Sequence, residues 1–192
     1  DPESTDEYYT AHKVTLTGYC IGETEITMNL YERARNISSQ SMKPMYYSST
    51  SFSSISDIKN CFNINLINEI ENVDFDLLTE AQWEFAARGG EGAPLFNGNS
   101  FSADNMNKIA WTSDNTLTVH PVDEMPANGF GIFDTCGNVW EMTLDWFSES
   151  AGYSAGFVAD YETGGITWDP KGPECEMTYQ NNASASHRRV LR

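Results

Sequence analysis

Four residues within one short stretch have the types and spacing of an oxygen-coordinated cation site. Two carboxylates and two intervening main-chain carbonyls fall at positions i, i+3, i+5 and i+7: Asp134, Gly137, Val139 and Glu141. Calcium takes about six to eight oxygen ligands of this kind, and a glycine allows the tight turn that lets them converge. The sequence therefore predicts a calcium site here. The alternative without a metal is a loop closed by Asp134 and Glu141, which would accept hydrogen bonds from main-chain amides.

The charge of the surrounding segment also points to a cation. No lysine or arginine occurs from 109 to 170, whereas ten acidic residues do: Asp114, Asp123, Glu124, Asp134, Glu141, Asp145, Glu149, Asp160, Glu162 and Asp169. Carboxylates that lie close together repel one another unless a cation neutralises them. The alternative is an acidic face that is solvated and binds nothing.

Other chemistries have weaker support. The four cysteines, at positions 20, 61, 136 and 175, are 41, 75 and 39 residues apart, so no Cys-x-x-Cys pair exists for a zinc or redox site. Their even number suits one or two disulfides in an oxidising compartment, and free thiols equally well. The three histidines lie outside any catalytic motif, and His120, which precedes a proline, is expected to be structural.

The composition is that of an acidic folded domain. With 192 residues, 40% of them hydrophobic, the chain can bury a core as one domain over 1–192, in which 1–11 form a disordered or extended lead-in. Eleven basic against 28 acidic residues give a formal charge of -17, which disfavours nucleic acid and anionic membrane surfaces as partners. No apolar run approaches the roughly 18 residues of a membrane span, so we expect no membrane insertion.

The first part of the chain carries three patterns of regular structure. The segment 12–27 begins with apolar alternation and is predicted as a strand, a short turn at Gly22 and a strand end. The segment 28–37 has helical spacing, with Thr27 as a plausible N-cap. A second helical pattern covers 55–70, although several asparagines weaken it.

The clearest predicted element is a helix from Thr79 to Gly90. Thr79-Glu80-Ala81-Gln82 is a capping box, and Arg88 followed by two glycines is typical of a helix C-terminus. Beyond it Gly, Asn, Pro and Asp recur every few residues, so the last hundred residues are predicted to form loops and short strands.

Several strings in one order resemble a known family. They cover 19–27, 78–90, 120–122, 128–134 and 136–142, and the most specific are Thr-Glu-Ala-Gln-Trp-Glu from Thr79 and Gly-Asn-Val-Trp-Glu from Gly137. These strings strongly resemble the formylglycine-generating enzyme, or sulfatase-modifying factor, family, from about Lys13 to the last residue. The resemblance implies an α+β, C-type-lectin-like fold that is irregular and loop-rich, with two to three helices and short antiparallel strands.

The resemblance also bears on sites. In the family the positions of Asp134, Gly137, Val139 and Glu141 form a calcium site. A second family calcium site would draw on 105–123, where no residue can be aligned. The cysteine pair with which the enzymes bind copper follows the string that here ends at Arg192, so no cysteine of this sequence can be taken as catalytic and copper is not expected.

The first hypothesis is therefore a non-catalytic domain, stabilised by calcium and located outside the cytoplasm, that binds an unknown protein or small-molecule ligand. Its most specific form is a variable protein of a diversity-generating retroelement, because such proteins share the scaffold. The alternative is a copper-dependent cysteine oxidase whose catalytic C-terminal segment is missing from this sequence. A third class is a purely structural envelope protein.

The tryptophans and the lectin-like fold do not identify the ligand. Trp83 and Trp140 lie in scaffold motifs and are expected in the core, whereas Trp146 and Trp168 are free to contact a ligand. The Glu-Pro-Asn and Gln-Pro-Asp signatures of sugar-binding C-type lectins are absent from the sequence. Sugar binding therefore does not follow from the fold.

Overall fold

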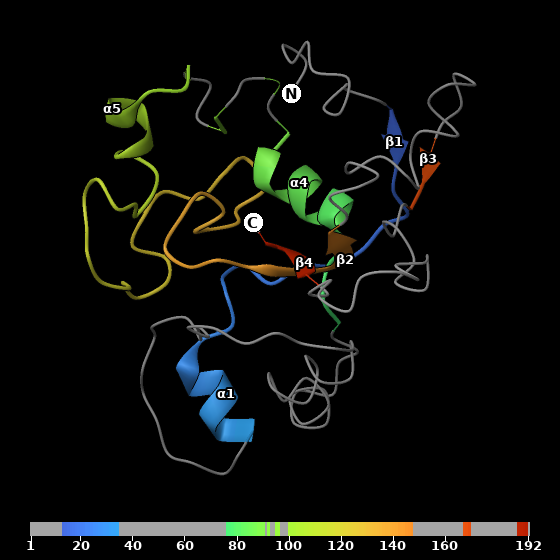
Figure 1. Cartoon of the computed structure of the whole chain (residues 1–192), viewed down its shortest axis with the longest axis horizontal. Coiled ribbons are helices and arrows are strands. Elements are labelled where there is room, and N and C mark those ends of the chain that lie inside the picture. The colour runs from blue at the N-terminus through green and yellow to red at the C-terminus, as the bar shows by residue number, and fades with distance from the viewer. Residues whose placement is uncertain are drawn as a thin grey trace, which may run out of the picture.

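The computed structural model describes residues 13–34, 76–90, 92, 95–96, 100–147, 167–169 and 188–191. Three helices and four strands occur in this part: β1 (Val14–Thr15), α1 (Met28–Ala34), α4 (Glu80–Arg88), α5 (Ala103–Met106), β2 (Met142–Phe147), β3 (Thr167–Trp168) and β4 (Arg188–Leu191). Helix α4 lies near the centre of the view, above the β2–β4 pair, and the long loops that precede β2 lie to its left (Figure 1). The described part thus has the few helices, short strands and extensive loops that the sequence predicts.

Helix α4 begins and ends where its sequence predicts. The hydroxyl of Thr79 accepts a hydrogen bond from the Gln82 amide at 3.2 Å, and the Gln82 side chain accepts one from the Thr79 amide at 2.9 Å. Gly89 ends the helix in the left-handed conformation with φ 60°. The capping box therefore fixes the first turn, and α4 becomes the framework on which the neighbouring loops pack.

Helix α1 also follows its predicted start. Thr27 Oγ1 accepts a hydrogen bond from the Leu30 amide at 3.2 Å, which is the N-cap contact expected from the sequence. The helix is described from Met28 to Ala34. The last residues of the predicted segment 28–37 and the whole second pattern, 55–70, lie outside the described residues.

The strands pair as two separate two-stranded sheets. Strands β2 and β4 are antiparallel, with Met142 opposite Leu191 and a register irregularity between Met142 and Trp146. Strands β1 and β3 are parallel, whereas the sequence predicted antiparallel strands. Asp169, directly after β3, explains this register because its carboxylate accepts hydrogen bonds from the Thr17 amide at 2.7 Å and the Thr17 hydroxyl at 3.0 Å.

The predicted strand over 12–27 is regular only at β1. The Thr17 amide bonds to the carboxylate of Asp169 and not to a neighbouring strand, so the ladder ends there. The chain then continues without strand pairing through Gly18 and Gly22 as far as Thr27, which forms an isolated bridge. A side-chain acceptor and two glycines therefore shorten what the alternation alone predicts to be longer.

A buried carboxylate joins α4 to β2. Asp145 is 1% exposed, and its Oδ2 accepts a hydrogen bond of 2.6 Å from the Glu80 amide at the first turn of α4. An anion at a helix N-terminus is favourable because the unpaired amides carry partial positive charge. Burial, followed by the nearby carboxylates of Glu84 and Asp145, raises the pKa of Glu80 to about 8.

Among the described residues, no helix has the length and hydropathy of a membrane span.

The C-terminal end of α4 is joined to the next loop by one buried amide. Asn128, 6% exposed, donates from Nδ2 to the Ala86 carbonyl at 2.7 Å. Its Oδ1 accepts from the amides of Phe130 at 2.9 Å and Ile132 at 3.2 Å. With a longer contact of 3.4 Å from Nδ2 to the Ala87 carbonyl, one side chain bonds four main-chain groups and fixes the turn 128–132 against the helix.

We expect Asn128→Ala to destabilise the protein by about 2–4 kcal/mol, because it leaves buried main-chain groups without partners. The midpoint of urea unfolding measures this. The matched control is Asn107→Ala at an exposed position, which should change the free energy of unfolding by less than about 0.5 kcal/mol. Equal effects of the two substitutions would contradict the role assigned to Asn128.

Candidate functional site

The four residues predicted to bind calcium lie in a loop that leads directly into β2. Two of its residues that are not glycine, Asp134 and Asn138, have left-handed backbone conformations, with φ 56° and 64°. Side chains with oxygen acceptors tolerate this conformation better than others, and two such turns fold the segment tightly. The loop is the orange segment beside α4 in Figure 1.

Asn138 holds the loop in place through both its main chain and its side chain. Its amide donates to the Trp111 carbonyl at 2.8 Å, and its Oδ1 accepts from the His120 amide at 3.0 Å. Its Nδ2 donates to Glu25 Oε2 at 2.9 Å and to the His120 carbonyl at 3.3 Å. Segments from three parts of the chain are thereby brought to one point.

Gly137 is required by the same packing. Its φ is 133°, and a Cβ at this position would collide with the Trp111 carbonyl oxygen. Only glycine therefore allows the loop to approach the segment around Trp111 so closely.

His120 supports this arrangement from the other side. Its ring stacks on the Trp111 indole, with centroids 3.8 Å apart, and its two nitrogens lie 2.9 Å from the Thr116 hydroxyl and 3.2 Å from Glu124 Oε2. All of these contacts join His120 to residues between 111 and 124. They are the contacts of a structural residue, in agreement with the expectation from the sequence.

Three carboxylates gather around the loop: Glu25, Asp134 and Glu141. Burial, followed by the carboxylates of Asp134 and Glu141, raises the pKa of Glu25 to about 8. Burial likewise raises the pKa of Glu141 to about 7, against a lowering hydrogen bond from the Trp83 side chain. Burial also raises the pKa of Asp134, although the Asp123 amide, which donates to Oδ2 at 2.9 Å, lowers it. The cluster thus lacks compensating positive charge.

Several oxygens near these carboxylates have no donor among the described residues. Glu25 Oε1 is buried without a hydrogen-bond partner. No described residue donates to the main-chain carbonyls of Gly137 or Val139. Acceptors without donors are what a cation requires, because it replaces the missing hydrogen bonds.

The side chains of this cluster do not make a metal site by themselves. In the described part of the chain, no three side chains of His, Cys, Asp or Glu converge closely enough to hold an ion. A cation here would therefore need main-chain carbonyls, as the predicted set of two carboxylates and two carbonyls provides. Asp134, Gly137, Val139 and Glu141 supply oxygen atoms of the kind that such an ion takes, and calcium at them stays a prediction.

Glu25 is the member of the cluster that the spacing of residues in the sequence does not assign to the site. It lies 113 positions before Asn138, its hydrogen-bond partner. The only sequence signal was its place within the string 19–27, one of those that carry the family resemblance. Spacing within the loop could not identify a residue so distant in the chain.

The expectation that Trp140 is a core residue is wrong. Its side chain is 78% exposed. Glu141, its neighbour, turns toward Glu25 and Trp83, and adjacent side chains of an extended segment point in opposite directions. Trp83 is partly buried, and its hydrogen bond to Glu141 links α4 to the loop.

The two described cysteines form no reactive pair. Cys20 is exposed and Cys136 partly buried, and both are free thiols. Burial raises the pKa of Cys136, which lowers its fraction of thiolate at neutral pH. Cys61 and Cys175 lie outside the described residues.

Comparisons with known proteins agree with the motifs. A family model for the sulfatase-modifying factor enzyme 1-like domain matches residues 34–190. A formylglycine-generating enzyme of Streptomyces coelicolor is 34% identical over 108 residues, which cover 50% of this chain and 31% of that protein. An inactive C-alpha-formylglycine-generating enzyme 2 of Bos taurus is 40% identical over 80 residues, which cover 37% of this chain and 27% of that protein. The matched part is thus about a third or less of each relative.

Among solved structures, Treponema denticola variable protein 1 has a similar fold. The TM-score is 0.61 at 21% identity, covering 76% of this chain and 69% of that chain. At this level of identity the likeness concerns the fold alone.

Proposed function

Because the chain belongs to the family of sulfatase-modifying factor enzyme 1-like domains, we propose that it is a non-catalytic domain that binds a protein or small-molecule ligand and is stabilised by calcium. Its fold is like that of a variable protein, and variable proteins are the most specific form of this proposal. The calcium ion would be held by Asp134, Glu141 and the carbonyls of Gly137 and Val139.

The observation that carries the proposal is the uncompensated cluster of Glu25, Asp134 and Glu141. Three carboxylates with raised pKa values lie beside main-chain carbonyls that have no described donor. A divalent cation removes the repulsion and satisfies the carbonyls at once. The ion would hold the loop against α4, where Trp83 bonds Glu141. Its role is to fix a scaffold rather than to react.

The absence of catalysis is proposed from the cysteines. The resemblance assigns copper binding to a pair of cysteines, whereas the two described cysteines are an exposed Cys20 and a partly buried Cys136 that are both free. Copper(I) prefers thiolate ligands, and burial raises the pKa of Cys136, which leaves little thiolate there to bind it. Relatives with the name of an inactive enzyme show that the family includes such members.

The alternative, a copper-dependent cysteine oxidase, is favoured by the relatives named formylglycine-generating enzyme. A Cys-x-Pro-x-Arg peptide incubated with the protein, copper and oxygen separates the two. We expect no aldehyde product by mass spectrometry, with a formylglycine-generating enzyme as the positive control. Turnover of the peptide would overturn the proposal of a non-catalytic domain.

We propose a location outside the cytoplasm for the same protein. Calcium modules with dissociation constants of about 10⁻⁴ to 10⁻³ M are filled only where calcium is abundant, as it is outside cells. Bound calcium would also neutralise part of the formal charge of -17 in such a setting.

A further inference from the structure

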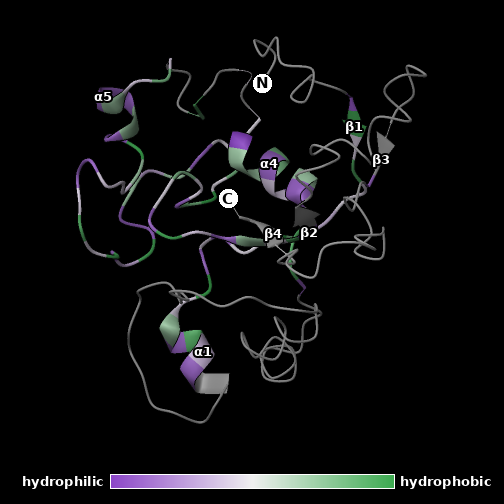
Figure 2. Ribbon diagram, in the orientation of Figure 1, coloured by the Kyte–Doolittle hydropathy of each residue, from purple (hydrophilic) through white to green (hydrophobic). Residues whose placement is uncertain are grey.

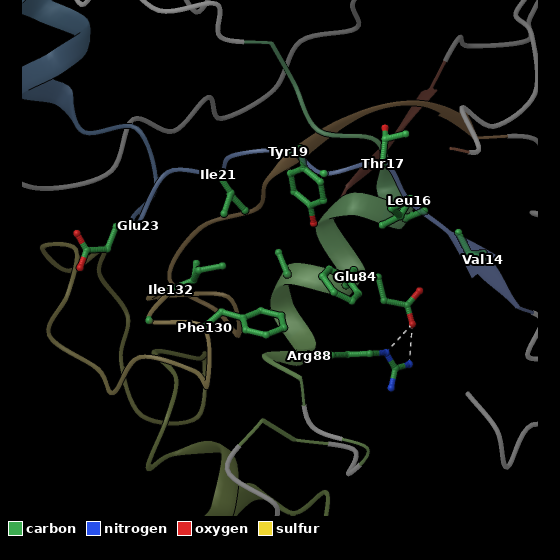
Figure 3. A pocket seen from close by; sticks show the side chains of 15 residues that line it. Val14, Leu16, Thr17, Tyr19, Ile21, Glu23, Glu84, Arg88, Phe130 and Ile132 are labelled. Atoms are coloured by element: carbon green, nitrogen blue, oxygen red, sulfur yellow. Dashed lines mark hydrogen bonds and ion pairs between the residues drawn. The ribbon is translucent and has the colours of Figure 1, made fainter. Parts of the chain in front are cut away.

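An apolar groove runs along one face of α4 (Figure 3), and none of the three clustered carboxylates lines it. Its volume is about 950 Å³. Its walls are the segment 14–23, the helix itself and the turn 130–132. Six of its fifteen lining residues have large apolar side chains: Val14, Leu16, Ile21, Phe85, Phe130 and Ile132. A groove of this size and composition is suited to a ligand with apolar groups.

Two aromatic rings within the groove are unusually accessible. Phe85 is 54% exposed and Phe130 is 49% exposed, and their ring centroids lie 5.5 Å apart. Phe85 belongs to α4, while Phe130 lies in the turn that Asn128 fixes against the helix. The pair is therefore held in position before any ligand arrives. Adjacent exposed aromatic rings of this kind are typical of interaction surfaces.

One wall of the groove offers free main-chain groups. From Gly18 to Gly22 exposed and partly buried residues alternate, and Tyr19 and Ile21 line the groove. None of these five residues forms a main-chain hydrogen bond with another described residue. The Tyr19 hydroxyl, which donates to the Gln82 carbonyl at 2.6 Å, ties the segment to α4. The segment is thus an irregular edge that is anchored to α4 and leaves main-chain groups to which a strand can add.

The charge at the groove favours a basic partner. Glu23 ends this edge with an exposed carboxylate that no described residue pairs. Glu84, by contrast, accepts hydrogen bonds from Arg88 at 2.9 and 2.6 Å, so these two charges compensate each other (Figure 3). The remaining charge of the lining is negative, as is the whole chain at -17. A lysine or arginine of a partner would be attracted at long range by the net charge of the chain and at short range by the carboxylate of Glu23.

We propose that this groove binds an extended polypeptide segment of a partner protein. The segment adds to the edge 18–22, places alternate apolar side chains over Phe85 and Phe130, and brings a basic residue to Glu23. The inference rests on the proposed binding function and specifies its partner. Main-chain hydrogen bonds would supply affinity, and the apolar and acidic contacts would supply selectivity.

A labelled peptide tests this directly by fluorescence anisotropy. The probe has ten residues, alternates valine and serine, and ends in arginine. We expect it to bind at least ten times more tightly than a scrambled peptide in which the valines are contiguous. N-methylation of one alternate set of residues should abolish binding, whereas methylation of the other set should not. This difference distinguishes strand addition from general stickiness, and equal effects of the two sets would overturn the proposal.

Variants of the protein locate the site. Phe85→Asp and Phe130→Asp should each weaken peptide binding at least tenfold, and Glu23→Lys about threefold to tenfold. The matched control is Phe101→Asp, because Phe101 is 73% exposed and does not line the groove. Circular dichroism establishes that each variant is folded. Unchanged binding in all three groove variants would overturn the proposal.

The other possible occupants give different results. If the natural occupant is a small apolar molecule, such a molecule will displace a hydrophobic dye from the groove, and neither set of N-methylated peptides will differ from the unmethylated peptide. A second copy of this chain would appear as a dimer by light scattering that Phe85→Asp dissociates. Either result without peptide binding contradicts a partner segment. The calcium-dependent stability of the same samples shows whether the proposed scaffold function fails as well.

Discussion

Addition of about 10 mM calcium to the calcium-free protein is expected to raise its melting temperature by roughly 5–10 °C. For a site with a dissociation constant of about 100 µM, this concentration is about a hundred times the dissociation constant and stabilises the folded state by about 2.7 kcal/mol. For a chain of this size each kcal/mol corresponds to roughly 2–4 °C. Differential scanning calorimetry with and without a chelator measures the shift.

Glu141→Gln should remove most of this calcium shift, because a neutral amide binds a divalent ion far less well than a carboxylate. The matched control is Asp104→Asn, which removes one negative charge at an exposed position on α5. It should keep the full shift. If Glu141→Gln also keeps it, calcium binds elsewhere and the predicted ligand set is wrong.

The calcium-free protein should lose stability as the pH rises from about 6 to 9, by roughly 5 °C in melting temperature. Glu25, with a pKa of about 8, and Glu141, with a pKa of about 7, both titrate above the ordinary glutamate value when folded. A carboxyl group whose pKa is raised by folding stabilises the protein when protonated. This contribution is complete below the unfolded pKa and is lost as the pH passes through the folded value.

Calcium should reverse this dependence. The ion binds the charged carboxylates, so the calcium shift should grow between pH 6 and 9. Glu25→Gln should flatten the calcium-free profile, since the amide has the shape of the protonated acid without its titration. Part of the slope should persist in this variant, because Glu80 also has a raised pKa of about 8. An unchanged profile would show that Glu25 is not charged or discharged in this range.

The regular elements were predictable where a local rule decides them. The capping box at Thr79 and the glycines after Arg88 fix α4 by contacts within a few residues, and Thr27 does the same for α1. Figure 2 shows hydrophilic and hydrophobic residues interspersed along α4, but hydropathy does not decide burial there, because Glu80 is 2% exposed and Phe85 is 54% exposed. The short, parallel β1–β3 pair was not predictable, because the side chain of Asp169 decides its register from 152 positions away.

The candidate site divides in the same way. The loop from Asp134 to Glu141 was visible in the sequence because glycine and acidic residues recur at close spacing. Glu25 was not, because only tertiary structure brings it to the loop. Trp140 was predicted to lie in the core because every residue of its motif was assigned to the scaffold. The side chain of Glu141 points inward instead, and that of its neighbour Trp140 points into solvent.

The contact between Glu25 and Asn138 has a consequence for how fast the domain folds. It closes a stretch of 113 positions, and a contact of such separation is entropically costly and tends to form late on the route to the native state. Asn138 holds the loop that carries the predicted calcium ligands, so the ion would find no ordered loop before this contact has formed, after the rate-limiting barrier. Its benefit should therefore appear as slower unfolding, with refolding nearly unaltered, which makes the ion a determinant of the protein's lifetime.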